Sequence, residues 1–114
     1  MILHIATRPE WQAAQQSGLY RPAAFRTEGF IHCSSVDQVA IVADRFFHGR
    51  RDLLLLYIEE SRLASELRWE SSADALQSLG PFPHVYGPLN VDAAVRVLDF
   101  VPGADGHFAA PALS

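Results

Sequence analysis

A continuous apolar run, from Leu53 to Ile58, lies near the middle of this 114-residue chain. It is far shorter than the roughly 20 residues that a membrane-spanning helix needs. A short apolar run of this kind is typical of a strand that is buried on both faces. We therefore expect residues 53–58 to form the central strand of a sheet that is covered on both sides.

Two helices are expected, and each begins with a capping-box pattern. The segment from Thr7 to Glu10 combines a capping threonine, a proline in the first helical turn and an acidic residue, which predicts a helix over residues 8–17. Ser35 to Gln38 repeats this pattern. The apolar residues that follow are spaced by three and four, so a second helix is expected from residue 36 up to His48 and Gly49.

The other regular segments are short runs that are rich in β-forming residues. The order strand, helix, strand, helix and then mostly strands predicts an α+β domain rather than a doubly wound α/β sheet. The chain length suits one domain, which we place at residues 1–101. Residues 102–114 are rich in Pro, Gly and Ala without an amphipathic period, and they predict a loose C-terminal tail. The predicted strands are residues 2–6, 29–33, 53–58, 67–70, 84–86 and 93–101.

Charge and cysteine content exclude several functional classes. The net charge of −4 argues against a broad phosphate-binding surface, so no duplex DNA partner is expected. Cys33 is the single cysteine, which excludes an internal disulfide and favours a reducing compartment. The first residues lack the pattern of a secretory signal, and no apolar run reaches membrane-spanning length. We expect a cytoplasmic domain without a membrane partner, and the sequence leaves its oligomeric state open.

The histidines are the main candidates for chemistry, because the chain has no Gly-rich phosphate loop, His-Glu-x-x-His, Gly-x-Ser-x-Gly or paired cysteines. His4, His32 and His84 lie in short predicted strands, whereas His48 and His107 resemble ordinary loop residues. The three strand histidines could together hold a zinc-type ion. Their spacing matches no recognised ligand pattern, so we expect no metal and keep a His-based metal-dependent hydrolase as an alternative function.

Strand alternation places further polar groups beside these histidines. His32 and Ser34 share one side of their predicted strand, and His84 and Tyr86 share one side of theirs. Glu70 follows a tryptophan, and a carboxylate beside large aromatic side chains can be partly desolvated and act as an acid, a base or a cation stabiliser. For His4 and His32 the alternative is a core side chain that is bonded to a backbone carbonyl. For His84 and Tyr86 it is a tyrosine that packs at a turn, and for Glu70 it is a solvated residue on an edge strand.

Taken together, these residues resemble the bacterial domain-of-unknown-function family 952. That family is similar to the ADP-ribosyltransferase-like superfamily, which includes NAD-using transferases and RNA 2′-phosphotransferases. The resemblance implies an ADP-ribosyltransferase-like fold, with a mixed or antiparallel sheet and two N-terminal helices. It is carried by residues 2–5, Trp11, Ala14, residues 28–34, Gln38, residues 69–70 and residues 82–89.

The resemblance also implies roles for the candidate residues. It implies a transferase-like enzyme, or a binder, for a nucleotide-type ligand such as NAD, ADP-ribose or a phosphate-bearing compound, with NAD as the implied cofactor. Ile5 replaces a glycine of the transferase strand, which favours the alternative of a non-catalytic interaction or regulatory module. The implied catalytic residues are His4, His32 and Glu70, and the implied ligand-binding residues are Ser34, His84 and Tyr86.

Overall fold

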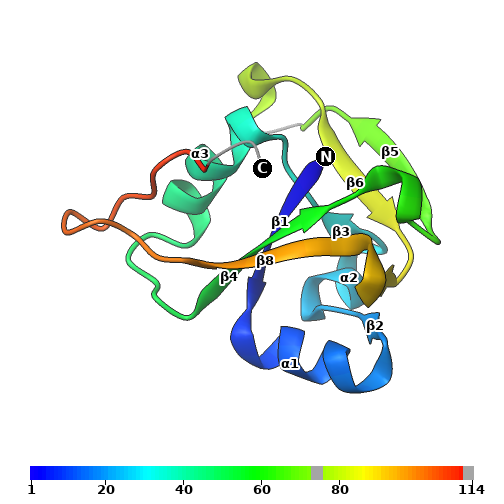
Figure 1. Ribbon diagram of the computed structural model, residues 1–114. Coiled ribbons are helices and arrows are strands. Elements are labelled where there is room, and N and C mark those ends of the chain that lie inside the picture. The colour runs from blue at the N-terminus through cyan, green and yellow to red at the C-terminus, as the bar shows by residue number, and fades with distance from the viewer. Residues whose placement is uncertain (73–75, 112–114) are drawn as a thin grey trace.

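The computed structural model describes residues 1–72 and 76–111, in which three α-helices accompany antiparallel strands (Figure 1). The predicted α+β class is therefore confirmed. The helices are α1 (Arg8–Ser17), α2 (Ala23–Glu28) and α3 (Val36–Phe46). The strands are β1 (Ile2–Thr7), β2 (Leu19–Tyr20), β3 (Ile31–His32), β4 (Leu53–Ile58), β5 (Glu66–Glu70), β6 (Phe82–Tyr86), β7 (Leu89–Asn90) and β8 (Ala94–Phe100).

The strand β4 is the middle of a three-stranded antiparallel sheet with the order β1-β4-β8. Leu3 pairs with Tyr57 on one edge of β4, and Leu55 pairs with Leu98 on the other edge. A second three-stranded sheet has the order β3-β6-β5, and β2 and β7 form a short separate pair. The prediction that residues 53–58 form a central strand is confirmed.

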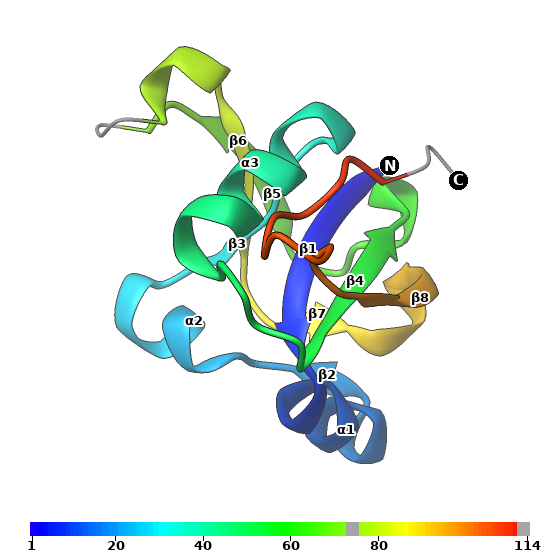
Figure 2. The ribbon, with the colours of Figure 1, turned by 90° about the vertical axis from the view of Figure 1, so that its left-hand side faces the viewer.

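Every residue of β4 is buried because both faces of its sheet are covered. Leu54 and its even-numbered neighbours pack with Trp11 of α1 and with side chains of the second sheet. Leu55 and its odd-numbered neighbours pack with Val39 of α3 and with Phe108 near the C-terminus, and Figure 2 shows α3 against this side of the sheet. Successive strand side chains alternate between the two faces. A strand covered on both faces must therefore be apolar at every position.

The two larger sheets are joined at one point. Leu3 of β1 and Ser34, which follows β3, exchange a pair of backbone hydrogen bonds of 2.8 Å each. The N–H of Cys33 donates to the carbonyl of Pro83 in β6 at 3.0 Å. The beginning of β1 is therefore fixed beside the end of β3, and this junction places the polar side chains of both strands close together.

Local capping explains α1 and α3. The Oγ1 of Thr7 accepts a hydrogen bond from the N–H of Glu10 at 3.4 Å, and the N–H of Ser35 donates to Gln38 Oε1 at 2.9 Å. Both predicted helices are confirmed, although α3 ends at Phe46, slightly before its expected end. No helix in the described residues is long and apolar enough to cross a membrane.

The helix α2 corrects the expectation of two N-terminal helices. It has six residues, starts after Pro22 without a side-chain cap, and contains no buried residue, so no capping or amphipathic pattern marks it. Gly29 ends it in a left-handed conformation with a φ of 84°, which glycine adopts at low cost. The strand predicted over residues 29–33 is therefore limited to Ile31–His32.

The segment after β8 returns to the domain. Of the tail predicted over residues 102–114, residues 112–114 lie outside the described part of the chain. Within residues 102–111, Phe108 is buried and its ring lies 4.7 Å from that of Phe100. The N–H of Phe108 also donates to Asp44 of α3 at 2.7 Å. A single anchoring aromatic side chain creates no amphipathic period, so the sequence predicted only a loose tail.

Candidate functional site

A cleft of about 740 Å³ opens between α2, α3 and the strands β1, β3 and β6. Sites for small molecules typically measure about 300 to 1,000 Å³. The cleft wall is mainly apolar, with polar side chains at a few positions. Of the predicted site residues, the wall contains His4, His32, Ser34 and His84. The remaining two, Glu70 and Tyr86, lie outside the wall and are connected to it through His84.

His84 is held by a carboxylate on the neighbouring strand. Its Nδ1 lies 2.8 Å from Glu70 Oε1, and the hydroxyl of Tyr86 donates to the same oxygen at 2.5 Å. An ionised carboxylate only accepts hydrogen bonds, so the Nδ1 of His84 carries the proton. The other ring nitrogen, Nε2, has no hydrogen-bond partner among the described residues. His84 therefore offers Nε2 at the cleft wall.

The environment of Glu70 differs from the expected desolvation. Its side chain is 38% exposed, and the adjacent Trp69 faces solvent. The hydrogen bonds from Tyr86 and His84, in that order, lower the pKa of the Glu70 carboxyl below its ordinary value. The cross-strand pairing thus stabilises the ionised form of Glu70, which suits orienting a neighbouring group better than donating a proton.

Phe30 is the centre of a ring cluster, which we define as Phe30, His32, His84 and Tyr86. Its ring stacks on His84 with centroids 4.1 Å apart, and it meets the edge of His32 at 4.7 Å. The Phe30 ring also contacts the Tyr86 ring, with centroids 5.2 Å apart. The guanidinium of Arg68 lies over the Tyr86 ring, 4.4 Å from its centroid. These contacts restrict the rotation of His84.

His32 is the exposed member of the ring cluster. Its side chain is 53% exposed, and its Nε2 forms an ion pair with Glu28 at the end of α2 when the ring is protonated. Its ring centroid lies 5.1 Å from that of His84. Because both imidazoles line the cleft, a ligand that reaches His84 also passes close to His32.

His4 has a different environment, because both of its ring nitrogens are used inside the protein. Nδ1 lies 2.5 Å from the carbonyl oxygen of His32, which can only accept, so Nδ1 is the donor. Nε2 then accepts from the hydroxyl of Tyr20 at 2.7 Å. Burial lowers the pKa of His4 to about 4, and burial also raises the pKa of Tyr20. A neutral, fully bonded ring matches the core-histidine alternative.

Ser34 and Cys33 border the cleft beside this junction. Ser34 is largely buried, and it lines the cleft as one of the few polar residues of the wall. Burial raises the pKa of the Cys33 thiol, which disfavours the reactive thiolate. The structure thus places Ser34 at the cleft wall, and the environment of Cys33 argues against a cysteine nucleophile.

Comparison with known proteins places the chain in a family. Residues 5–97 match the family described as "Protein of unknown function (DUF952)". The chain belongs to this family. No curated protein matches the sequence. Because the family description names no activity, the function of this DUF952 domain has to be inferred from its own geometry.

Solved structures of a similar protein support the fold. This DUF952 domain is similar to protein CC0527 from Caulobacter crescentus, with 36% identity and a TM-score of 0.83 to a crystal structure, over 95% of this chain and 92% of that chain. The solution NMR structure of CC0527 matches with 36% identity and a TM-score of 0.78, over 93% of this chain and 89% of that chain. The relationship therefore extends over nearly the whole domain.

Side chains of the types that can bind a metal ion come together elsewhere in the chain. Within residues 1–72 and 76–111, three His, Cys, Asp or Glu side chains place ligand atoms within 4.8 Å of one another only at Asp44, His48 and His107. The three strand histidines therefore lack the grouping that a His-based metal-dependent hydrolase requires. Sequence reasoning treated His48 and His107 as ordinary loop residues, and no signal in the local sequence connects them.

Two other side chains of the site were also missed. Phe30 lies two residues before His32 in the strand predicted over residues 29–33, but the sequence assigned it no role, although it contacts every other ring of the cluster. Tyr20, the partner of His4, gave no signal because β2 has only two residues. A two-residue strand is too short to show a period.

Proposed function

We propose that the cleft binds a small nucleotide-type ligand and that His84 Nε2 is the group that exchanges a proton with it, in a transferase-type reaction. The observation that carries this proposal is the pairing of His84 Nδ1 with Glu70 at 2.8 Å while Nε2 stays unpartnered among the described residues. An imidazole that is oriented by a carboxylate accepts a proton at the opposite nitrogen, and the carboxylate stabilises the resulting cation.

The wall of the cleft supports a ligand that combines a flat ring with hydroxyl or phosphate groups. Phe46, Phe47 and Phe82 supply apolar surface for a ring. The hydroxyl of Ser34 and the imidazole of His32 supply polar contacts on the same wall. NAD and ADP-ribose have this combination of groups, and they are the first ligands to test.

The test is a thermal-shift screen with NAD, ADP-ribose and nucleoside phosphates. A ligand at a hundredfold excess over its dissociation constant stabilises the folded state by about 2.7 kcal/mol. In His84→Asn the amide occupies the place of Nδ1 and can still donate to Glu70, but Nε2 is lost. We expect the shift to disappear in this variant and to persist in Gln16→Ala, an exposed change on α1 outside the cleft. A shift that survives in His84→Asn would refute the role of Nε2, and no shift with any ligand would refute the nucleotide proposal.

A non-catalytic binding module is the second candidate, because His4 has no free nitrogen for chemistry. This candidate predicts the same ligand shift without turnover. Incubation with the bound ligand followed by mass analysis separates the two functions: a new product that is absent in His84→Asn supports the enzyme, and an unchanged ligand supports the module.

A further inference from the structure

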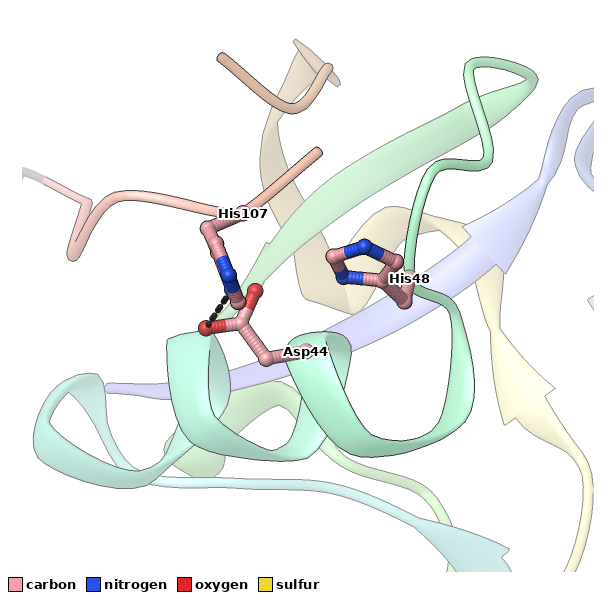
Figure 3. Close-up of side chains that lie close together, drawn as sticks. All are labelled: Asp44, His48 and His107. Carbon is pink, nitrogen blue, oxygen red and sulfur yellow. Dashed lines mark ion pairs between the residues drawn. The ribbon is translucent and has the colours of Figure 1, made fainter. Parts of the chain in front are cut away.

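Three side chains outside the cleft meet at the C-terminal end of α3 (Figure 3). Asp44 lies in the last turn of α3, His48 follows the end of the helix, and His107 comes from the C-terminal segment. Figure 3 shows the Asp44 carboxylate and both imidazoles pointing into one common space. One ligand atom from each of the three lies within 4.8 Å of the other two.

The spacing of Asp44 and His107 suits two ligands of one ion. His107 Nδ1 lies 3.4 Å from Asp44 Oδ2. This separation is longer than the roughly 2.7 to 3.2 Å of an N–H···O hydrogen bond. Two ligand atoms that each lie about 2.0 to 2.1 Å from a tetrahedral zinc ion are about 3.3 Å apart. The spacing is therefore compatible with two ligands of one ion.

Hydrogen bonds hold the carboxylate and the C-terminal segment in place. Asp44 Oδ1 accepts from the N–H of Phe108 at 2.7 Å, which leaves Oδ2 for the space between the imidazoles. The N–H of Gly103 donates to the carbonyl of His107 at 2.8 Å, and the N–H of His107 donates to Asp105 at 3.0 Å. Partners of this kind orient metal ligands in known sites.

The third ligand, His48, is positioned against Gly106. The N–H of Gly49 donates to the carbonyl of Gly106 at 3.3 Å, which ties the two loops together. Gly106 has a φ of 84°, and a Cβ at this position would lie 2.8 Å from His48 Nε2. The ring of His48 thus rests directly on the glycine backbone, and its centroid lies 4.8 Å from that of His107.

The electrostatic environment favours a cation. The C-terminal end of a helix carries a partial negative charge, and α3 ends between Asp44 and His48. Asp105 is a second carboxylate close to the imidazoles, and its Oδ1 accepts a hydrogen bond from the N–H of His107 at 3.0 Å. Of the two nearest arginines in sequence, Arg50 is engaged by Asp52, and the guanidinium of Arg45 lies over the ring of Phe46 at 5.9 Å.

We propose that Asp44, His48 and His107 bind one divalent transition-metal ion, with zinc as the best match, and that this ion fastens the C-terminal segment to α3. Two imidazoles and a carboxylate are a ligand set that zinc accepts, and they leave a fourth position for water. The ion joins residues that are about 60 positions apart, so it also closes a long loop of the chain.

The test is zinc titration of untagged full-length protein after treatment with a chelator, followed by calorimetry and thermal unfolding. We expect one zinc per chain and a midpoint that rises by about 10 °C at a hundredfold excess over the dissociation constant. Asp44→Asn keeps an oxygen that accepts from Phe108 but loses the charge, and His107→Ala removes an exposed ring. Each should weaken zinc binding by at least about tenfold.

His32→Asn is the matched control, because it removes an exposed histidine that also faces a carboxylate, Glu28, outside the proposed site. It should keep the wild-type affinity for zinc. Without zinc, Asp44→Asn should unfold at nearly the wild-type temperature, so its loss of binding reports a lost ligand rather than a lost fold. Zinc affinity that is absent in the wild type, or unchanged in both Asp44→Asn and His107→Ala, would overturn the proposal.

Cobalt provides an independent readout of the same site. Co²⁺ in a tetrahedral site absorbs strongly in the visible range, whereas hydrated Co²⁺ absorbs weakly. The wild type and His32→Asn should show the strong bands on addition of Co²⁺, and both ligand variants should lose them. Bands of equal strength in all four proteins would show that the cobalt is bound elsewhere.

Discussion

His4 and His84 are equally buried, with 8% of each residue exposed, yet the protein uses them differently. His4 has partners on both ring nitrogens, and they make it part of the core. His84 has one partner, Glu70, and presents its second nitrogen at the cleft wall. Burial alone therefore does not identify a functional histidine. A functional histidine is identified by the number of its ring nitrogens that the fold leaves without a partner.

The largest expected effect is on stability, through His4→Ala. This change leaves the Tyr20 hydroxyl and the His32 carbonyl without partners in a tightly packed region, so the free energy of unfolding should fall by about 3 kcal/mol. Urea unfolding measures the loss. His4→Asn is the control, because its amide can still donate to the carbonyl and should cost less. A loss below about 1 kcal/mol in His4→Ala would mean that His4 is not a core residue.

The second expected effect is a dependence of the free energy of unfolding on pH, and it arises from His4. Its pKa is lowered from 6.5 to about 4 in the folded state, so the unfolded chain binds the proton first as the pH falls. The stability that depends on the neutral ring is fully present above pH 6.5 and is lost by about pH 4, in total roughly 3 kcal/mol. Unfolding at a series of pH values should show a steeper loss for the wild type than for His4→Asn. Parallel curves would contradict this assignment.

A smaller effect, on ligand affinity, is expected from Glu70→Gln. The glutamine oxygen still accepts from His84 and Tyr86, but the charge that stabilises a protonated His84 is lost. Ligand affinity in the thermal-shift assay should fall by up to about tenfold while the unfolding temperature without ligand barely changes. A large loss of stability without ligand would instead assign Glu70 to the core, as for His4.

The smallest effect is expected from Tyr86→Phe, which removes only one hydrogen bond to Glu70. The bond from the Tyr86 hydroxyl is the largest cause of the lowered pKa of Glu70, so this pKa should rise toward its ordinary value of 4.5. Carbon-13 NMR of the carboxyl group measures the change directly, with wild-type protein as the reference. An unchanged Glu70 pKa would show that His84 alone holds the carboxylate.

The central part of the fold could be predicted because its signals are local. The apolar run at Leu53–Ile58 predicted a strand covered on both faces, and the capping patterns at Thr7 and Ser35 predicted two helices. The helix α2 was missed because a short exposed helix has neither a cap nor an apolar stripe. Phe108 was missed because one anchoring side chain creates no pattern.

The candidate site was predictable only in its residue types and strand faces. Alternation placed His84 and Tyr86 on one side, and the structure brings both to Glu70 across the β5–β6 pair. The register of that pair is a tertiary property, so the sequence did not reveal the hydrogen bonds. The same reason applies to His107, whose distance from Asp44 depends on how the C-terminal segment folds back. The catalytic and binding roles of the residues stay predictions.

The order of the strands also has a consequence for how the chain folds during its synthesis. Among the strand pairs of the described residues, only β5 and β6 are consecutive in sequence, whereas β4 pairs with β1 and with the last strand, β8. Contacts between distant segments make folding slower than contacts between neighbouring segments do. One edge of the most apolar strand therefore stays open until β8 has left the ribosome. During that interval the nascent chain is most exposed to aggregation.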